Sequence, residues 1–205
     1  MTLNIVLSDI KKSYDGRTLF DIPELVLKPG FNLLFGQSGI GKTTLGKIIG
    51  GLEKADCGRI TGIQGSPAVL FQENLLLPTL NAVNNVYVVC RKKEFKTLGH
   101  NLLRELNFSD ADMKKLPSEL SGGMMRRVAI VRTIIFCLEC GGNFVLLDEP
   151  FTALDSNTKL AAAEMIKKYL YDKTVLIITH DRDDAEIFEG TALEFSAVCN
   201  KQGKN

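Results

Sequence analysis

The sequence is poor in the residues that build metal sites and disulfide frameworks. It has no tryptophan, two histidines and five cysteines. Two histidines exclude a histidine-rich metal site, and one Cys-x-x-C pair, Cys137 and Cys140, without a second pair is a weak metal signal. We therefore interpret the cysteines as small, buried apolar side chains in a reducing compartment.

An excess of one charge is also missing. The chain has 25 Lys and Arg against 24 Asp and Glu, a formal net charge of +1. Duplex-binding proteins usually carry a strong basic excess, so nucleic acid is not an expected partner.

Long apolar runs are absent as well. A membrane span needs about 18 apolar residues, and the nearest candidate, residues 130–145, is broken by Arg132, Glu139 and two glycines. The N-terminus has no basic region followed by an apolar block, so we expect no signal peptide and a protein that folds in the cytoplasm.

What is present is an alternation of short apolar runs and amphipathic stretches in one globular domain, residues 1–205, with 45% apolar composition. The predicted strands are 3–7, 17–27, 31–35, 68–71, 145–147, 175–178 and 192–198. The predicted helices are 42–50, 94–106, 123–136 and 159–169. Continuous apolar runs at 145–147 and 175–178 suit strands buried on both faces of a parallel sheet.

Residues 36–43 match the phosphate-binding pattern G-x-x-x-x-G-K-[ST], between a predicted strand and a predicted helix. Its glycines let backbone N–H groups turn toward phosphate oxygens, and the following helix N-terminus favours the negative charge. Lys42 should reach the β- and γ-phosphates, and Thr43 should offer a hydroxyl to Mg²⁺. The alternative is an ordinary glycine-rich turn. The nucleotide-binding prediction covers Gly36, Gln37, Ser38, Gly39, Ile40, Gly41, Lys42, Thr43 and Thr44.

Two further strands end in polar side chains. Asp148 and Glu149 follow residues 144–147, and His180 follows residues 175–179. Ligands bind at the carboxyl ends of parallel strands. We therefore expect Asp148 to hold Mg²⁺, usually through water, and Glu149 to polarise the attacking water as general base. The alternative for the pair is a solvated strand end.

Between these motifs lies Leu120-Ser121-Gly122-Gly123-Met124, in which Ser121 can cap the next helix. A P-loop, then Leu-Ser-Gly-Gly, then a strand ending in Asp-Glu resembles one family, the ATP-binding cassette (ABC) ATPases. The resemblance implies an α/β P-loop NTPase fold. It would have a mostly parallel sheet core, an N-terminal antiparallel β subdomain and an inserted helical lobe. We place the core at about 1–72 and 137–205, and the lobe at about 73–136.

The resemblance also implies roles for residues that carry little signal alone. Tyr14 matches the aromatic residue that stacks on adenine, although a locally packed turn aromatic is the alternative. Gln72 matches the glutamine that touches Mg²⁺ and the attacking water. His180, in a Thr-His-Asp context, matches the switch histidine that contacts the γ-phosphate. The predicted catalytic residues are Lys42, Gln72, Glu149 and His180. The predicted metal ligands are Thr43, Gln72 and Asp148.

Two segments of the resemblance concern assembly. Ser121, Gly122 and Gly123 would complete the ATP site of a neighbouring subunit, and Asp155 lies in a loop that crosses the interface. The implied assembly is a head-to-tail homodimer, or a heterodimer with a related ATPase. It would bind ATP and Mg²⁺, drive two transmembrane permease subunits, and serve an extracytoplasmic substrate-binding protein indirectly. The chain would lie in the cytoplasm, peripheral on the inner face of the cell membrane.

Residues 71–78 are similar to the glutamine-loop region of nitrate, sulfonate and taurine importers, and Met124 is common there. Thr152, where glycine is typical, departs from that type, and the short stretch after His180 predicts a reduced helical tail. The leucines of 73–85 are either lobe core or a surface that receives a permease helix. We interpret Arg126 and Arg127 as a solvated helix face.

Four other functions remain as alternatives. An exporter ATPase is the rival within the family. A DNA-repair or chromosome ATPase would have a long coiled coil where this chain has a short lobe. An ATP-binding module without turnover is disfavoured by the intact set Lys42, Asp148, Glu149 and His180. A P-loop kinase has no use for the Ser-Gly-Gly segment.

Overall fold

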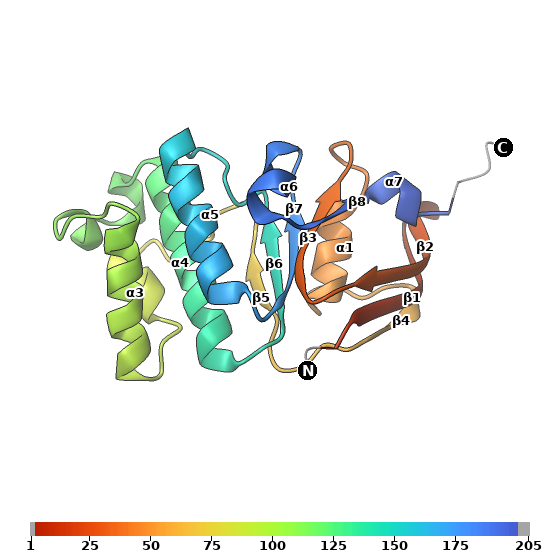
Figure 1. Ribbon diagram of the computed structural model, residues 1–205, viewed down its shortest axis with the longest axis horizontal. Helices are drawn as coiled ribbons and strands as arrows, with labels where there is room; N and C mark the ends of the chain where they lie inside the picture. The colour runs from red at the N-terminus through yellow and green to blue at the C-terminus, as the bar shows by residue number, and fades with distance from the viewer. Residues whose placement is uncertain (1–2, 201–205) are drawn as a thin grey trace.

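The computed structural model describes residues 3–200, which form two sheets with helices around them (Figure 1). The larger sheet is five-stranded and entirely parallel, in the order β5-β6-β7-β3-β8. Its strands are β3 (Gly30–Phe35), β5 (Ala68–Leu70), β6 (Phe144–Asp148), β7 (Thr174–Ile178) and β8 (Thr191–Glu194). The parallel core predicted from the apolar runs is therefore confirmed.

The central strands are buried on both faces, as their unbroken apolar runs require. In β6 and β7 every residue is buried, and neighbouring residues along each strand belong to different core clusters. One cluster lies against α4 (Gly122–Cys140) and α5 (Ser156–Leu170), and the other against α1 (Lys42–Ile49).

The smaller sheet is antiparallel, in the order β2-β1-β4, as the fold prediction for the N-terminal part states. Its strands are β1 (Ile5–Tyr14), β2 (Arg17–Leu27) and β4 (Cys57–Thr61), and a tight turn joins the first two. Ile5, Leu7 and Ile22 are buried in the same cluster as residues of α1. Helix α1 therefore lies between the two sheets, visible on the right of Figure 1.

The helical lobe stands at the opposite end of the molecule (Figure 1). It comprises α2 (Ala82–Tyr87), α3 (Lys93–Glu105), two 3-10 turns (Asp112–Lys114 and Pro117–Glu119) and the first turns of α4. Leu102, Leu103 and Val86 are buried in the cluster that includes α4. Within residues 3–200, no helix is both long enough and apolar enough to cross a membrane.

The end of the described chain differs from the prediction. A strand was predicted over 192–198, but β8 ends at Glu194 and a short helix, α7 (Phe195–Val198), follows. The turn into α7 buries Phe195 edge-to-face against Phe20, with ring centroids 5.7 Å apart. The apolar residues after Glu194 therefore cover the rim of the core between the sheets. Helix α6 (Asp183–Phe188) precedes β8.

The cysteine prediction is correct in part. Cys137 is buried, and burial raises the pKa of its thiol to about 11. Cys57 is exposed and the other three are half-buried, so the prediction of buried side chains is wrong for Cys57. Cys57 opens β4, an edge strand whose outer positions face solvent.

Candidate active site

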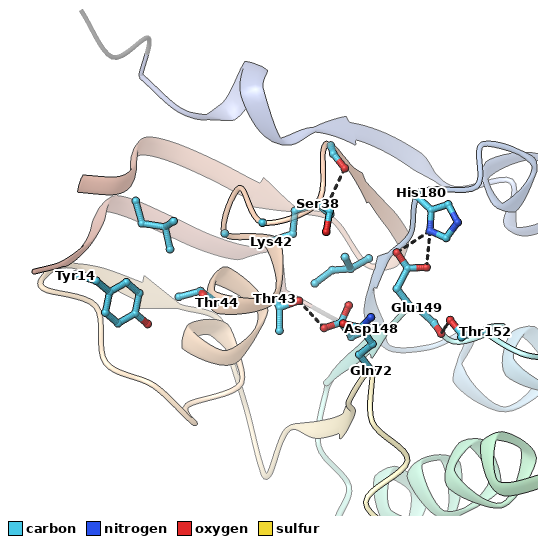
Figure 2. A pocket seen from close by; sticks show the side chains of 15 residues that line it. Tyr14, Ser38, Lys42, Thr43, Thr44, Gln72, Asp148, Glu149, Thr152 and His180 are labelled. Atoms are coloured by element: carbon cyan, nitrogen blue, oxygen red, sulfur yellow. Dashed lines mark hydrogen bonds and ion pairs between the residues drawn. The ribbon is translucent and has the colours of Figure 1, made fainter. Parts of the chain in front are cut away.

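A cavity of about 690 Å³ opens at the carboxyl edge of the parallel sheet (Figure 2). It gathers side chains from β1, the loop before α1, the loop after β5, and the ends of β6 and β7. Its lining includes Tyr14, Gly36, Ser38, Gly39, Gly41, Lys42, Thr43, Thr44, Gln72, Asp148, Glu149, Thr152 and His180. Most of the site residues predicted from the sequence thus share one hollow.

The glycine loop depends on backbone conformations that favour glycine. Gly41 has φ +108°, and a Cβ there would lie 2.8 Å from Phe20. Lys42 is nearly buried, and its Nζ donates to the carbonyls of Gly36 and Gln37 at 2.7 and 2.8 Å. The side chains of Gln37 and Ile40 line an adjacent cavity of about 560 Å³ rather than this one. The loop therefore curls around the lysine ammonium, where an anion would be attracted.

Thr43 and Asp148 meet at the floor of the cavity. The Thr43 hydroxyl donates to Asp148 Oδ2 at 2.7 Å, and Asp148 is 2% exposed. Burial raises the pKa of the Asp148 carboxyl, with the hydrogen bond from Thr43 acting in the opposite direction. A buried carboxylate beside a hydroxyl is a suitable pair of oxygen ligands for a hard cation. Within residues 3–200 no group of three or more His, Cys, Asp or Glu converges, so a cation here would need phosphate or water ligands too.

Glu149 and His180 form the second pair. His180 Nδ1 lies 2.9 Å from both carboxylate oxygens of Glu149, and this contact raises the pKa of His180 (Figure 2). Glu149 has φ +47°, an uncommon conformation for a non-glycine residue, while its N–H donates to the Ile178 carbonyl at 2.8 Å. The bond to β7 holds this backbone in place and directs the carboxylate into the cavity. Strain of this kind clusters at functional sites.

Tyr14 lies at the far side of the cavity from Glu149 (Figure 2). Tyr14 is 47% exposed, and Lys12 Nζ lies 4.9 Å from its ring centroid. The Tyr14 hydroxyl donates to Glu53, and this bond raises the pKa of the phenol. Lys12 also pairs with Glu53 at 3.1 Å. The ring is thus held from its edge while much of its surface remains open.

The predicted interface residues lie elsewhere. Four residues predicted to bind ATP do not line the cavity within residues 3–200: Ser121, Gly122, Gly123 and Asp155. Ser121 Oγ accepts from the Met124 N–H at 3.2 Å and caps α4, as predicted. Asp155 Oδ1 caps α5 through the N–H groups of Asn157 and Thr158, at 3.1 and 3.0 Å.

These two helix starts pack against each other. A Cβ on Gly123 would lie 2.6 Å from the Ala153 carbonyl oxygen, so only glycine allows the approach. The Ser-Gly-Gly turn and the loop before Asp155 therefore form one surface in this chain, separate from the cavity.

Two basic residues of α4 were predicted to be solvated. Arg126 is 1% exposed, so that prediction is wrong for it, and Arg127 is half-buried. The Arg126 guanidinium donates to backbone carbonyls of the segments that carry Gln72 and Asp148. Burial lowers its pKa to about 10, which leaves it charged at neutral pH. No sequence pattern distinguished this arginine from its neighbour.

Lys159 also escaped the sequence predictions. Its Nζ lies 2.5 Å from Asp181, the residue after His180, and 2.7 Å from Asp184 in α6. Burial lowers the pKa of Lys159, but hydrogen bonds to these two carboxylates outweigh it and the pKa is raised. Because Lys159 lies one turn after Asp155 in α5, it ties the histidine loop to the interface loop.

Comparison with known proteins agrees with this geometry. The sequence profile of the ABC transporter family matches residues 25–152. The chain is 36% identical over 187 residues to the aliphatic sulfonates import ATP-binding protein SsuB 1 of Rhodococcus jostii, covering 87% of this chain and 73% of that protein. It is 35% identical over 184 residues to the aliphatic sulfonates import ATP-binding protein SsuB of Corynebacterium glutamicum, covering 86% and 73%.

A solved structure extends the comparison to three dimensions. The dimeric post-hydrolysis state of the ATP-binding cassette MJ0796, bound to ADP and Pi, superposes with a TM-score of 0.80 and 26% identity, covering 93% of each chain. The family match, the relatives and this superposition bear out the predicted resemblance and fold. The chain belongs to the ABC transporter family and has the fold of its ATP-binding cassettes.

Proposed function

We propose that this chain is the ATP-hydrolysing subunit of an ABC importer of the sulfonate type. The observation that carries the proposal is the single cavity that unites Lys42, the Thr43–Asp148 pair and the Glu149–His180 pair. The names of the relatives favour import over export. Substrate choice would rest with the membrane and binding-protein partners.

Nucleotide binding would occupy the length of the cavity. Lys42 would leave the carbonyls of Gly36 and Gln37 and meet the β- and γ-phosphates, while loop N–H groups and the α1 N-terminus receive the remaining oxygens. The exposed ring of Tyr14, held by Glu53, would offer an apolar face to adenine. Backbone groups of Gln37 and Ile40 would take part through the loop.

The residues at the floor fit a Mg²⁺ ion. Thr43 Oγ1 and Asp148 Oδ2 are adjacent oxygen donors, Asp148 is buried, and Gln72 lines the same cavity. Bound Mg²⁺ would neutralise charge on the β- and γ-phosphates. Asp148 would reach the ion through water, and Gln72 would touch both the ion and the attacking water.

Glu149 is the candidate general base. Its carboxylate projects from the strained start of the loop after β6, toward the region that the γ-phosphate would occupy. Its carboxylate is hydrogen-bonded to His180. We propose that the γ-phosphate draws His180 away, freeing Glu149 to accept a proton from water. Lys159 would limit the travel of the histidine loop.

The complete site would contain two chains. Ser121, Gly122 and Gly123 begin α4 with N–H groups that lack intrahelical partners, a suitable cap for phosphate oxygens. In this chain they lie apart from Lys42, so we propose a head-to-tail dimer in which each chain completes the other's site. A two-fold dimer then yields two equal sites, and a related ATPase as partner would yield two unlike ones.

The permease would bind beside the Gln72 loop. A hollow of about 250 Å³ lined by Leu52, Val69, Phe71, Val89 and Phe136 adjoins that loop. In the segment after Gln72, Leu75 and Leu77 are 56% and 43% exposed and add apolar surface that a partner could cover. We propose that a short cytoplasmic helix of each of two permease subunits docks here, which would hold the chain at the inner face of the membrane.

Reconstitution tests the proposal. The chain would be incorporated into vesicles with the permease encoded beside it and the matching binding protein, and uptake of a labelled aliphatic sulfonate would be measured with ATP on the cassette side. We expect uptake that needs ATP and the binding protein and that disappears with Glu149→Gln. ATP-dependent efflux would contradict the importer assignment, and so would a rate of ATP hydrolysis that is the same with and without the binding protein.

The docking site has its own test. Leu75→Asp and Leu77→Asp should abolish association with the permease while ATP binding by the isolated chain survives, because neither residue lines the nucleotide cavity. Leu160→Asp, at an equally exposed leucine of α5, is the control. Cross-linking of the permease to the opposite face of the chain would refute this docking site.

A further inference from the structure

Arg126 occupies an unusual place for an arginine. It lies in the second turn of α4, yet it is 1% exposed and is among the largest fully buried side chains. Burying a charge is costly unless hydrogen bonds compensate it. A buried guanidinium therefore has to be explained by its partners.

Those partners belong to two segments of the active site. From the glutamine loop, Nη1 reaches the carbonyls of Phe71 and Gln72, at 2.6 and 3.2 Å. From the end of β6, Nη2 reaches the carbonyls of Asp148 and Glu149, the latter at 2.7 Å. One planar group thus bridges the residues proposed to hold Mg²⁺ and to activate water.

Two further bonds complete the set. Arg126 Nε donates to the Pro150 carbonyl at 3.0 Å, and Nη1 also donates to Asn74 Oδ1 at 3.2 Å. All three guanidinium nitrogens are engaged, and five of the six acceptors are backbone carbonyls. The planar fork sets the spacing between the two segments, because its N–H directions do not vary independently.

We propose that Arg126 is a positioning residue of the ATPase reaction. By joining the glutamine loop to the end of β6, it fixes the distance between Gln72 and Glu149, so that both can contact the same attacking water. This inference rests on the proposed roles of Gln72 and Glu149. Arg126 does not itself line the nucleotide cavity, but it bonds the backbone of three residues that do, Gln72, Asp148 and Glu149. Its effect on Gln72 and Glu149 would be carried by their backbone carbonyls.

The same arrangement links chemistry to movement of the lobe. Arg126 lies five residues after Ser121 on the helix that would meet the partner's γ-phosphate. A displacement of α4 on closure would therefore move the glutamine loop and the catalytic strand end as one body. Register errors of about 1 Å at a reacting group can cost roughly 10²-fold in rate.

Lysine cannot replace this fork. Its ammonium keeps the charge but is one point with three donors, so it cannot span both segments. Arg126→Lys should remain folded and bind ATP without Mg²⁺ within about threefold of the original chain, because the P-loop is untouched. Its kcat should fall about 10²-fold, with KM much less changed. Arg127→Lys, the same substitution one residue later, is the control, since Arg127 bonds Leu106 and Gly123 instead.

A double-mutant cycle separates positioning from general damage. If Arg126 acts through Gln72, adding Arg126→Lys to Gln72→Ala should lower kcat by less than about threefold, because the Gln72 side chain that Arg126 positions is already absent. Independent damage to the fold would multiply the two effects and would lower the melting temperature in proportion. Glu149→Gln, measured alongside, tests the base assignment separately.

Near-normal kcat in Arg126→Lys would overturn the inference, and so would fully multiplicative effects in the cycle. Either result refutes the role of Arg126 even if Glu149→Gln is inactive, as the proposed function requires. The two proposals can therefore fail separately. A normal Glu149→Gln enzyme would instead refute the base role on which the inference rests. Thermal unfolding of every variant identifies a misfolded protein before its kinetics are read.

Discussion

The nucleotide cavity and the Ser-Gly-Gly surface differ in how many of their residues are brought together within one chain. Around the cavity, side chains already contact one another: Thr43 bonds Asp148, and His180 bonds Glu149. At the start of α4, Ser121 caps its own helix and Gly123 packs on the loop before Asp155. The first region is assembled to receive a ligand, whereas the second presents a helix N-terminus outward.

The difference has a physical origin in connectivity. Strand ends of one parallel sheet meet at one edge, so their side chains converge without further help. The Ser-Gly-Gly turn begins α4, which follows the lobe segments inserted between β5 and β6, and within residues 3–200 it does not line the P-loop cavity. A two-fold pairing of two copies would supply what is missing, because each copy would then offer its Ser-Gly-Gly turn to the other.

The largest predicted effect lies within the cavity. Glu149→Gln should retain ATP binding but lose about 10²–10⁴-fold in kcat, because a general base contributes that much. Loss of a carboxylate near the phosphates should also favour an ATP-bound dimer. Hydrolysis and gel-filtration measurements check both, with Glu164→Gln at an exposed position of α5 as the control. A wild-type rate in this variant would remove Glu149 from the role.

A smaller effect is predicted at the other end of the cavity. Tyr14→Ala should weaken ATP binding by about tenfold, since base–aromatic stacking contributes roughly 1–3 kcal/mol. Tyr14→Phe keeps the ring but loses the bond to Glu53, and its affinity should lie close to that of the original chain. Fluorescent-nucleotide titration measures both. Equal affinity for Tyr14→Ala and Tyr14→Phe would favour a local packing role.

The smallest effect concerns the Glu149–His180 pair. In the nucleotide-free chain the His180 pKa should exceed its ordinary value of 6.5, and Glu149→Gln should lower it. A raised pKa means that this contact stabilises the fold fully below the ordinary pKa, and that the contribution is lost as pH rises through the folded-state value. NMR titration checks the shift, with His100→Asn used to assign the two ring signals. An unchanged His180 pKa in Glu149→Gln would contradict the contact.

The strongest sequence signals concern local order along the chain. Residues 31–50 predicted a strand, a glycine loop and a helix, and β3 and α1 lie there. Apolar runs located β6 and β7, and helical spacing located α3 and α5 within a few residues. These succeed because period and turn chemistry are local properties. The strand β4 and the short helices α2 and α6 were missed, because few residues form each of them.

Contacts between distant residues were beyond such patterns. Arg126 follows the signature like any polar residue of an amphipathic helix, and only the carbonyls 54 and 22 residues away, at Gln72 and Asp148, explain its burial. Likewise Glu53, 39 residues from Tyr14, carries no motif. The family resemblance supplied Tyr14, Gln72 and Asp155, whose types alone predict almost nothing.

Because Ser121 caps α4, the loss of the cap has to be separated from an effect on dimerisation. Ser121→Arg removes the cap and adds a bulky cation, while Ser121→Ala removes the cap alone, at a cost of about 1 kcal/mol. If the two-chain site is correct, Ser121→Arg monomers bind ATP normally and fail to dimerise. Ser121→Ala should dimerise at somewhat higher protein concentration.

In the two-chain site, Lys42 of one copy and Ser121 of another hold the same ATP. The direct measurement mixes Ser121→Arg with Lys42→Ala, both carrying Glu149→Gln, and counts ATP retained on the dimer after gel filtration. Neither protein alone should retain an ATP-bound dimer. The mixture should form a heterodimer that retains one ATP, because one of its two sites has both an intact Lys42 and an intact Ser121. A mixture without retained ATP, or Ser121→Arg alone trapping ATP in a dimer, would contradict the claim.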